Sequence, residues 1–147
     1  MQGPQTNPET GAAADALMTL HRRTVDALTG YATMVEKAEP AFRHVAEAFR
    51  SLHARHADRL ARMLADIGRA ADDDGSLMGT VNAAVVTLRA FFDVIDADVM
   101  RNIRDGEAHV LAAFDAALAA PVTPAIAADL NDMRGEVTAL LHRHAGG

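Results

Sequence analysis

The chain has 147 residues, the size of a single domain that buries about 70% of the surface exposed by its unfolded form. Half of the residues are hydrophobic but only 4% are aromatic, so leucine, valine, methionine and alanine must fill the core. The net charge of −6 argues against a nucleic-acid-binding surface, and the lack of cysteine excludes disulfides, thiolate catalysis and cysteine-ligated metals.

Residues 1–11 form the first segment, and Pro4, Pro8 and Gly11 within it discourage regular structure. We expect a disordered leader there and a single domain over residues 12–145. The leader lacks both a basic start and an apolar block, and no apolar run approaches the ~18 residues that a membrane helix needs. The sequence therefore predicts a cytoplasmic protein that does not bind membranes.

Two long helices are predicted next, over 12–37 and 40–67, because apolar residues recur at spacings of three and four. The first apolar face carries Leu17, Leu20, Thr24, Leu28, Tyr31 and Val35. The second carries Phe42, Val45, Phe49, Leu52, His56, Leu60, Met63 and Ile67. Pro40 suits a first helical turn, and Gly68 is typical of the position just after a helix.

Three further helices are predicted over 77–95, over 97–119 and from Pro124 to near the C-terminus. In the helix over 97–119, Glu107 interrupts an apolar face that also contains Met100, Ile103, Leu111, Phe114 and Leu118. Pro121 ends that helix, and Thr123 before Pro124 is a strong start signal for the last one. Its face carries Ile126, Leu130, Met133, Val137 and Leu140.

The predicted class is all-α, because no segment alternates apolar and polar residues as a half-buried strand does. Four of the helices have 20 or more residues and reach about 30 Å at about 1.5 Å per residue. The shorter stretch over 77–95 can serve as a helical crossover that returns the chain to the starting end. We therefore expect a ferritin-like four-helix bundle rather than an up-down-up-down bundle.

His56 and Glu107 are the best functional lead, because an ionisable side chain facing a core is costly unless paired or metal-bound. In one interpretation they form a buried hydrogen-bonded pair that fixes helix register, or lie at the edge of the apolar face. In the other they bind iron, manganese or zinc, with Glu36, Glu136 or His144 completing the site. Satisfied core polar groups are the commoner case.

Other arrangements are weaker leads. Dinuclear carboxylate sites need a Glu-x-x-His pair on each of two helices, and no such pair occurs here. His53, three residues before His56, has less weight than His56. His142 and His144 are expected to be cations favoured by the helix dipole. His21 lacks the neighbouring lysine and glycine that histidine phosphotransfer needs.

Several weakly specific residues recur in an order that resembles a known family. They are Asp26, Gly30, Tyr31 and Glu36; Phe49, Arg55, Leu60 and Gly68; Gly75, Ser76 and Gly79; and Arg104, Gly106 and Glu107, followed by a histidine-bearing last helix. Over residues 17–142 the chain resembles the bacterial ferritin-like four-helix-bundle family called domain of unknown function 2383. The resemblance implies the bundle fold and, by analogy, metal binding, but no established activity.

One departure from that family is visible after Gly79, where a basic and aromatic pair is replaced by residues 81–83 of sequence Val-Asn-Ala. Two functions follow as expectations. The first is a non-enzymatic interaction, assembly or stress-associated protein that associates with itself. The alternative is an iron- or manganese-binding storage or oxidase protein of ferritin type, with an incomplete site at His56, Glu107, Glu36 and Glu136.

Overall fold

A computed structural model describes residues 8–69 and 97–145 of the chain. These residues form four long helices and contain no strand: α1 (Pro8–Lys37), α2 (Pro40–Asp66), α4 (Ala97–Ala119) and α5 (Pro124–Ala145). The all-α prediction is therefore confirmed. The predicted crossover helix over 77–95 lies outside the described residues.

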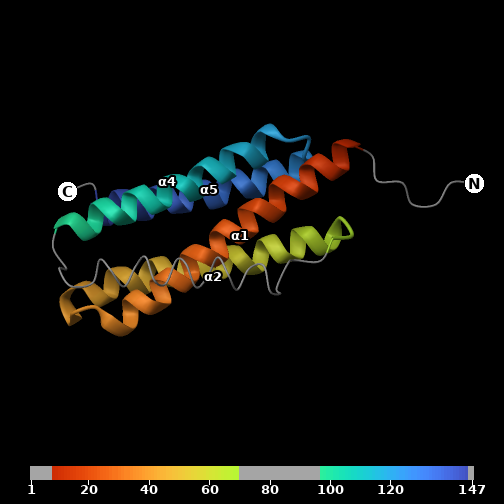
Figure 1. Ribbon diagram of the computed structural model, residues 1–147. Helices are drawn as coiled ribbons and strands as arrows, with labels where there is room; N and C mark the ends of the chain where they lie inside the picture. The colour runs from red at the N-terminus through yellow and green to blue at the C-terminus, as the bar shows by residue number, and fades with distance from the viewer. Residues whose placement is uncertain (1–7, 70–96, 146–147) are drawn as a thin grey trace, which may run out of the picture.

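The four helices pack as a bundle in which every neighbouring pair is antiparallel (Figure 1). Helix α1 packs against α2 and α4, and α5 packs against α4 and α2. Helices α2 and α4 run in the same direction, so Arg69 and Ala97 lie at opposite ends of the bundle. One long connection between the second and third long helices is the connectivity of ferritin-like folds. The four-helix-bundle prediction is confirmed, while kinship with ferritins stays a prediction.

The helix ends follow local signals in the sequence. Gly68 has φ +83° just after α2, and the amide of Arg69 donates to the carbonyl of Leu64 at 2.8 Å, which completes a Schellman cap. The amide of Ile126 donates to the Thr123 hydroxyl at 3.2 Å, as expected of an N-cap residue. The predicted start of the first helix is wrong, because α1 already begins at Pro8, where proline is tolerated in the first turn.

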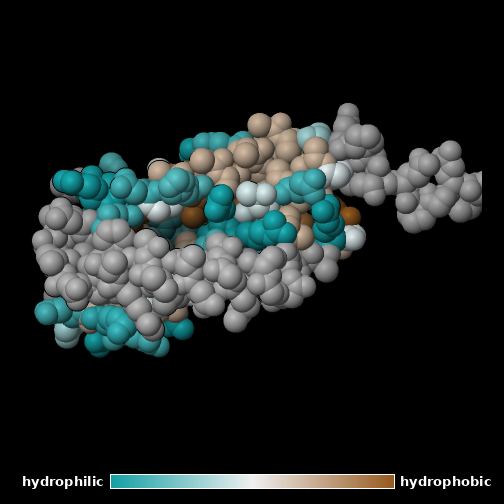
Figure 2. Space-filling view, in the orientation of Figure 1, coloured by the Kyte–Doolittle hydropathy of each residue, from teal (hydrophilic) through white to brown (hydrophobic). Residues whose placement is uncertain are grey.

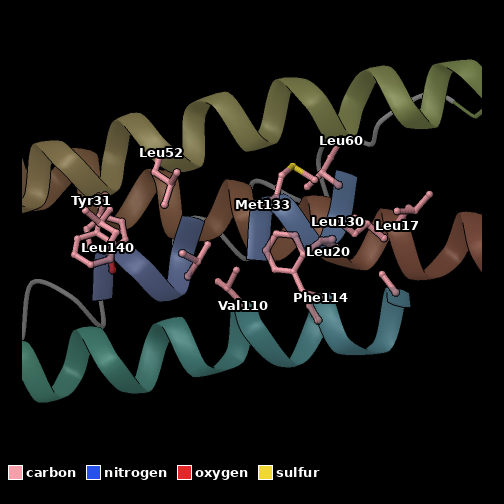
Figure 3. Close-up of a cluster of buried hydrophobic side chains, with 14 of the residues drawn as sticks. Leu17, Leu20, Tyr31, Leu52, Leu60, Val110, Phe114, Leu130, Met133 and Leu140 are labelled. Carbon is pink, nitrogen blue, oxygen red and sulfur yellow. The ribbon is translucent and has the colours of Figure 1, made fainter. Parts of the chain in front are cut away.

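The core lies along the bundle axis and receives side chains from all four helices. Figure 3 shows Leu17 and Leu20 of α1, Leu60 of α2, Phe114 of α4 and Met133 of α5 pointing toward one another. All five are fully buried, as are Phe49, Leu64, Leu130 and Val137. The core is therefore aliphatic, with few rings, as the composition predicts.

The outer surface of the α4 and α5 hairpin is rich in alanine. Figure 2 shows apolar colours over the C-terminal part of α4 and the turn that follows it. The exposed alanines of this region are Ala112, Ala116, Ala119, Ala125 and Ala128. Among the described helices, none is long and apolar enough to span a membrane.

Candidate functional site

Five polar side chains from all four helices meet between the interior and one solvent-facing edge of the bundle, and we call them the polar layer. They are Tyr31 of α1, His53 and His56 of α2, Glu107 of α4 and Glu136 of α5. Hydrogen bonds and ion pairs divide the layer into an inner cluster of Tyr31, His53 and Glu107 and an outer cluster in which Glu136 meets His56 and is approached by Arg55 and Arg59. Each helix of the bundle thus contributes to one polar region.

The buried face of α2 explains how two histidines reach the interior. This face is two residues wide, because Leu52 is buried beside His53 and Ala57 is buried beside His56. Residues three apart on a helix lie one turn from each other on the same side. The His53 and His56 rings accordingly meet edge to face, with centroids 6.4 Å apart.

The inner cluster is centred on one carboxylate oxygen. The Tyr31 hydroxyl donates to Oε1 of Glu107 at 2.8 Å, and Nε2 of His53 lies 2.6 Å from the same oxygen. The exposed fractions are 6% for Tyr31, 0% for His53 and 1% for Glu107. These short bonds in a buried setting fix the relative positions of α1, α2 and α4.

Aromatic contacts hold Tyr31 in place. Its ring stacks on Phe49 with centroids 5.1 Å apart and on the His53 ring at 5.7 Å. Burial raises the pKa of the Tyr31 phenol well above its ordinary value, and the charge of Glu107 and the hydrogen bond to it act in the same direction. Tyr31 is therefore a neutral hydrogen-bond donor to Glu107.

The outer cluster connects the layer to solvent. His56 is 1% exposed and its Nε2 lies 3.3 Å from Oε1 of Glu136, whose side chain is 42% exposed. Arg59 and Arg55 approach the Glu136 carboxylate at 3.5 and 3.8 Å. Burial lowers the pKa of His56, the bond to Glu136 and its charge oppose this shift, and His53 and Arg59 add to the lowering.

Three buried polar atoms of the layer have no hydrogen-bond partner within the described part of the chain. They are Oε2 of Glu107, Nδ1 of His53 and Nδ1 of His56. An unsatisfied buried polar atom costs about 1–3 kcal/mol, so native cores contain few of them. Their concentration in one layer distinguishes this region from the rest of the core.

The predicted burial of His56 and Glu107 is confirmed, but the predicted hydrogen bond between them is wrong. Glu107 bonds to Tyr31 and His53, whereas His56 bonds to Glu136. Helical periodicity correctly gave the face on which each residue lies. It could not give the partner, because partners depend on how the helices are aligned along the bundle.

The other predicted metal ligands are placed unevenly. Glu136 reaches the layer only at its solvent edge. Glu36 is exposed and does not join the layer, because five residues after Tyr31 correspond to a rotation of about 140° around the helix. His144 packs against His44 and Phe49, with ring centroids 6.1 and 6.2 Å away, and makes no described contact with Glu107.

His142 and His144 do occupy the last turn of α5, as predicted. For His144, however, burial lowers the pKa and the neighbouring His44 and Arg143 act in the same direction. The neutral ring is therefore favoured there over the expected cation.

Two residues of the inner cluster were not identified as site residues from the sequence. Tyr31 fits the apolar face of its helix, so the sequence pattern does not predict a polar role for its hydroxyl. His53 lies one position outside the idealised apolar stripe. The available signal was the His53-x-x-His56 spacing, since a second polar residue one turn from a buried histidine shares its environment.

The side chains of the polar layer suit a single iron or manganese ion better than a dinuclear centre. No three His, Asp or Glu side chains gather as a metal-holding group within residues 8–69 and 97–145, so a dinuclear carboxylate centre does not fit. A single ion fits better, because the Tyr31 hydroxyl oxygen is a third potential ligand beside the His53 imidazole and the Glu107 carboxylate. In addition, Oε2 of Glu107 is unpartnered. Oxygen and imidazole donors suit both metals.

Comparison with known proteins gives one family match, described as Domain of unknown function (DUF2383), over residues 12–120. The match includes Tyr31, His53, His56 and Glu107, whereas α5 and its Glu136 lie beyond it. No curated protein and no solved structure matches the chain significantly. The chain belongs to the family of the domain of unknown function 2383.

Proposed function

We propose that the protein binds a single iron or manganese ion at the inner cluster, with Tyr31, His53 and Glu107 as its ligands. The unpartnered Oε2 of Glu107 beside two further donors is the observation that carries the proposal. This set replaces the ligands expected from the sequence, because Glu36 is exposed and Glu136 bonds to His56 instead. His56 and Glu136 lie beside the ion's site rather than in it.

Charge supports a cation at this position. A carboxylate with 1% exposure is costly unless a positive charge compensates it, and among the described residues the ion-pair contact of Glu107 is with His53, which is positive only when protonated. A bound cation supplies that compensation and reverses the electrostatic effect on Tyr31, whose pKa burial and Glu107 now raise. Glu107, which accepts the hydrogen bond of the Tyr31 phenol, would then bind the same ion as Tyr31.

Metal retention after loading tests this proposal. The full chain is incubated with Mn²⁺, or with Fe²⁺ under argon, and dialysed, and the retained metal is measured by mass spectrometry. We expect about one ion per chain in the wild type and less than about a tenth of that in Glu107→Gln. Glu47→Gln is the matched control, since Glu47 is exposed and makes no described polar contact.

A second measurement separates ligand loss from misfolding. Circular dichroism of Glu107→Gln should show the helical content of the wild type, because glutamine retains the shape and one acceptor oxygen. An ion held by the folded state alone raises the free energy of unfolding by about 2.7 kcal/mol at 100 times its dissociation constant. Equal retention by Glu107→Gln and wild type would refute the proposed ligand set.

The interaction or assembly role expected from the sequence is the alternative. It becomes the better description if wild-type protein retains neither metal after loading. In that case the inner cluster serves to align α1, α2 and α4, and size-exclusion chromatography with light scattering measures self-association.

A further inference from the structure

A solvent-facing cavity of about 290 Å³ lies beside the outer cluster, between α2 and α5. Its lining residues are Arg55, His56, Asp58, Arg59, Arg62 and Glu136. All except Glu136 belong to α2, so one helix presents three guanidinium groups to the cavity. The buried imidazole of His56 separates these groups from the inner cluster.

The arginines of this cavity are loosely paired. Arg59 lies 3.5 Å from both Glu136 and Asp129, and Arg55 lies 3.8 Å from Glu136. Well-formed charge-assisted hydrogen bonds are about 2.7–2.9 Å long. Elsewhere in the molecule Arg134 meets Asp115 at 2.8 Å, so tight pairing does occur where geometry allows it.

Arg62 carries an uncompensated charge at the cavity. It is exposed and forms no ion pair with any residue in the described ranges. The cavity lining contains three arginines and two carboxylates, Asp58 and Glu136, and Asp129 outside the lining lies 3.5 Å from Arg59, so the unpaired guanidinium is that of Arg62. Guanidinium groups bind phosphate oxygens through paired, directional N–H donors.

We propose that this cavity binds a small tetrahedral oxyanion of the phosphate class, held chiefly by Arg59 and Arg62 with His56 beneath it. Arg59 can turn toward the anion because its present contacts are long. A bare divalent cation is disfavoured beside three arginines, so this site and the proposed metal site are separate. The proposal does not require that a metal binds at the inner cluster.

Titration with inorganic phosphate tests the proposal on the full chain. Two-dimensional NMR at constant ionic strength, balanced with sodium chloride, follows the amide and arginine N–H signals of α2. We expect saturable shifts that centre on Arg59, His56 and Arg62. Arg62→Gln should raise the half-saturating phosphate concentration about tenfold, because it removes charge-assisted hydrogen bonds to the anion.

Arg50→Gln is the matched control. Arg50 is exposed on the same helix, makes no described polar contact and lies outside the cavity, so its loss changes net charge equally. We expect its half-saturating concentration to equal that of the wild type. Equal weakening in both variants would show a general charge effect and would overturn the proposal, as would shifts that never saturate.

Two further arms identify the anion and separate the two proposed sites. Acetate should bind several times more weakly than phosphate, and equal binding would overturn the assignment to a tetrahedral oxyanion. Glu107→Gln, which should lose metal, should retain phosphate binding. Loss of phosphate binding in Glu107→Gln with preserved fold would contradict the independence of the two sites.

Discussion

The inner and outer clusters use similar residue types but differ in burial and in bond length. In the inner cluster, contacts to Glu107 are 2.6 and 2.8 Å long and every member is buried. In the outer cluster, contacts to Glu136 range from 3.3 to 3.8 Å and that carboxylate is 42% exposed.

This difference shows what position does to the same pair of functional groups. A histidine and a glutamate inside the core form a rigid contact, because water cannot replace either partner. The pair of His56 and Glu136 has an exposed carboxylate for which water and two arginines compete, so its net contribution is small. We expect the inner cluster to determine the stability of the fold and the outer cluster to determine the access of solvent to the polar layer.

The largest expected effect comes from Glu107→Leu. Tyr31 and His53 then lose their common acceptor, at about 1–3 kcal/mol for each buried group, partly offset by the apolar burial of leucine. We expect a loss of about 3 kcal/mol in the free energy of unfolding, measured by urea denaturation. Glu47→Leu, at an exposed position, should change it by no more than about 0.5 kcal/mol. Equal stabilities of the two variants would show that the buried Glu107 carboxylate contributes no more to folding than an exposed one.

Tyr31→Phe should have the next largest effect. It removes the donor at 2.8 Å from Glu107 while keeping the stacked ring, which isolates a hydrogen bond to a charged group worth about 1.5–3 kcal/mol. A double-mutant cycle with Glu107→Leu, which removes the acceptor, measures the coupling between the two side chains. A coupling energy near zero would show that the bond contributes nothing to folding.

Glu136→Gln should cost less than about 1 kcal/mol, because contacts of an exposed carboxylate with arginines are weak. The measurement is again urea denaturation, with Tyr31→Phe examined in the same buffer. A loss as large as that of Tyr31→Phe would mean that the outer cluster is as strongly coupled as the inner one.

The smallest expected effect is on ionisation. Burial lowers the pKa of His56 in the folded state below 6.5, so unfolded chains bind the proton first as the pH falls. Stability contributed by neutral His56 is therefore present above pH 6.5 and decreases below it toward the folded-state pKa. His56→Gln should reduce this decrease, while His144→Gln is the comparison at the other histidine with a lowered pKa.

NMR titration of the His56 ring measures the pKa directly. Glu136→Gln should lower it further, since Glu136 acts to raise it. A His56 pKa above 6.5 in the wild type would show that the contact with Glu136 outweighs burial, contrary to the assignment made from the structure.

Most helix boundaries were predictable because they depend on local residues. Pro40, Gly68 and the Thr123-Pro124 pair each act within one turn of the helix, and α2, α4 and α5 begin where the sequence indicates. The sequence pattern places the start of α1 too late. Pro8 and Gly11 suggest irregular structure there, although proline is tolerated in the first turn of a helix.

The candidate site was only half predictable. Periodicity placed His56 and Glu107 inside, but the hydrogen bond from Tyr31 to Glu107 joins residues 76 positions apart. Such a contact depends on the axial alignment of α1 against α4, which repeats of three and four residues do not encode. His53 was given too little weight because one apolar position per turn describes a narrower buried face than α2 has.

The placement of Arg69 and Ala97 at opposite ends of the bundle has a consequence for folding kinetics. The α1 and α2 hairpin and the α4 and α5 hairpin each close through a turn of a few residues, so their contacts are local and form quickly. Joining the hairpins requires closing the longer connection made by residues 70–96, and the entropic cost of such closure grows only slowly with length. Lengthening that connection should therefore slow docking only slightly, whereas lengthening either short turn should delay formation of the hairpin itself.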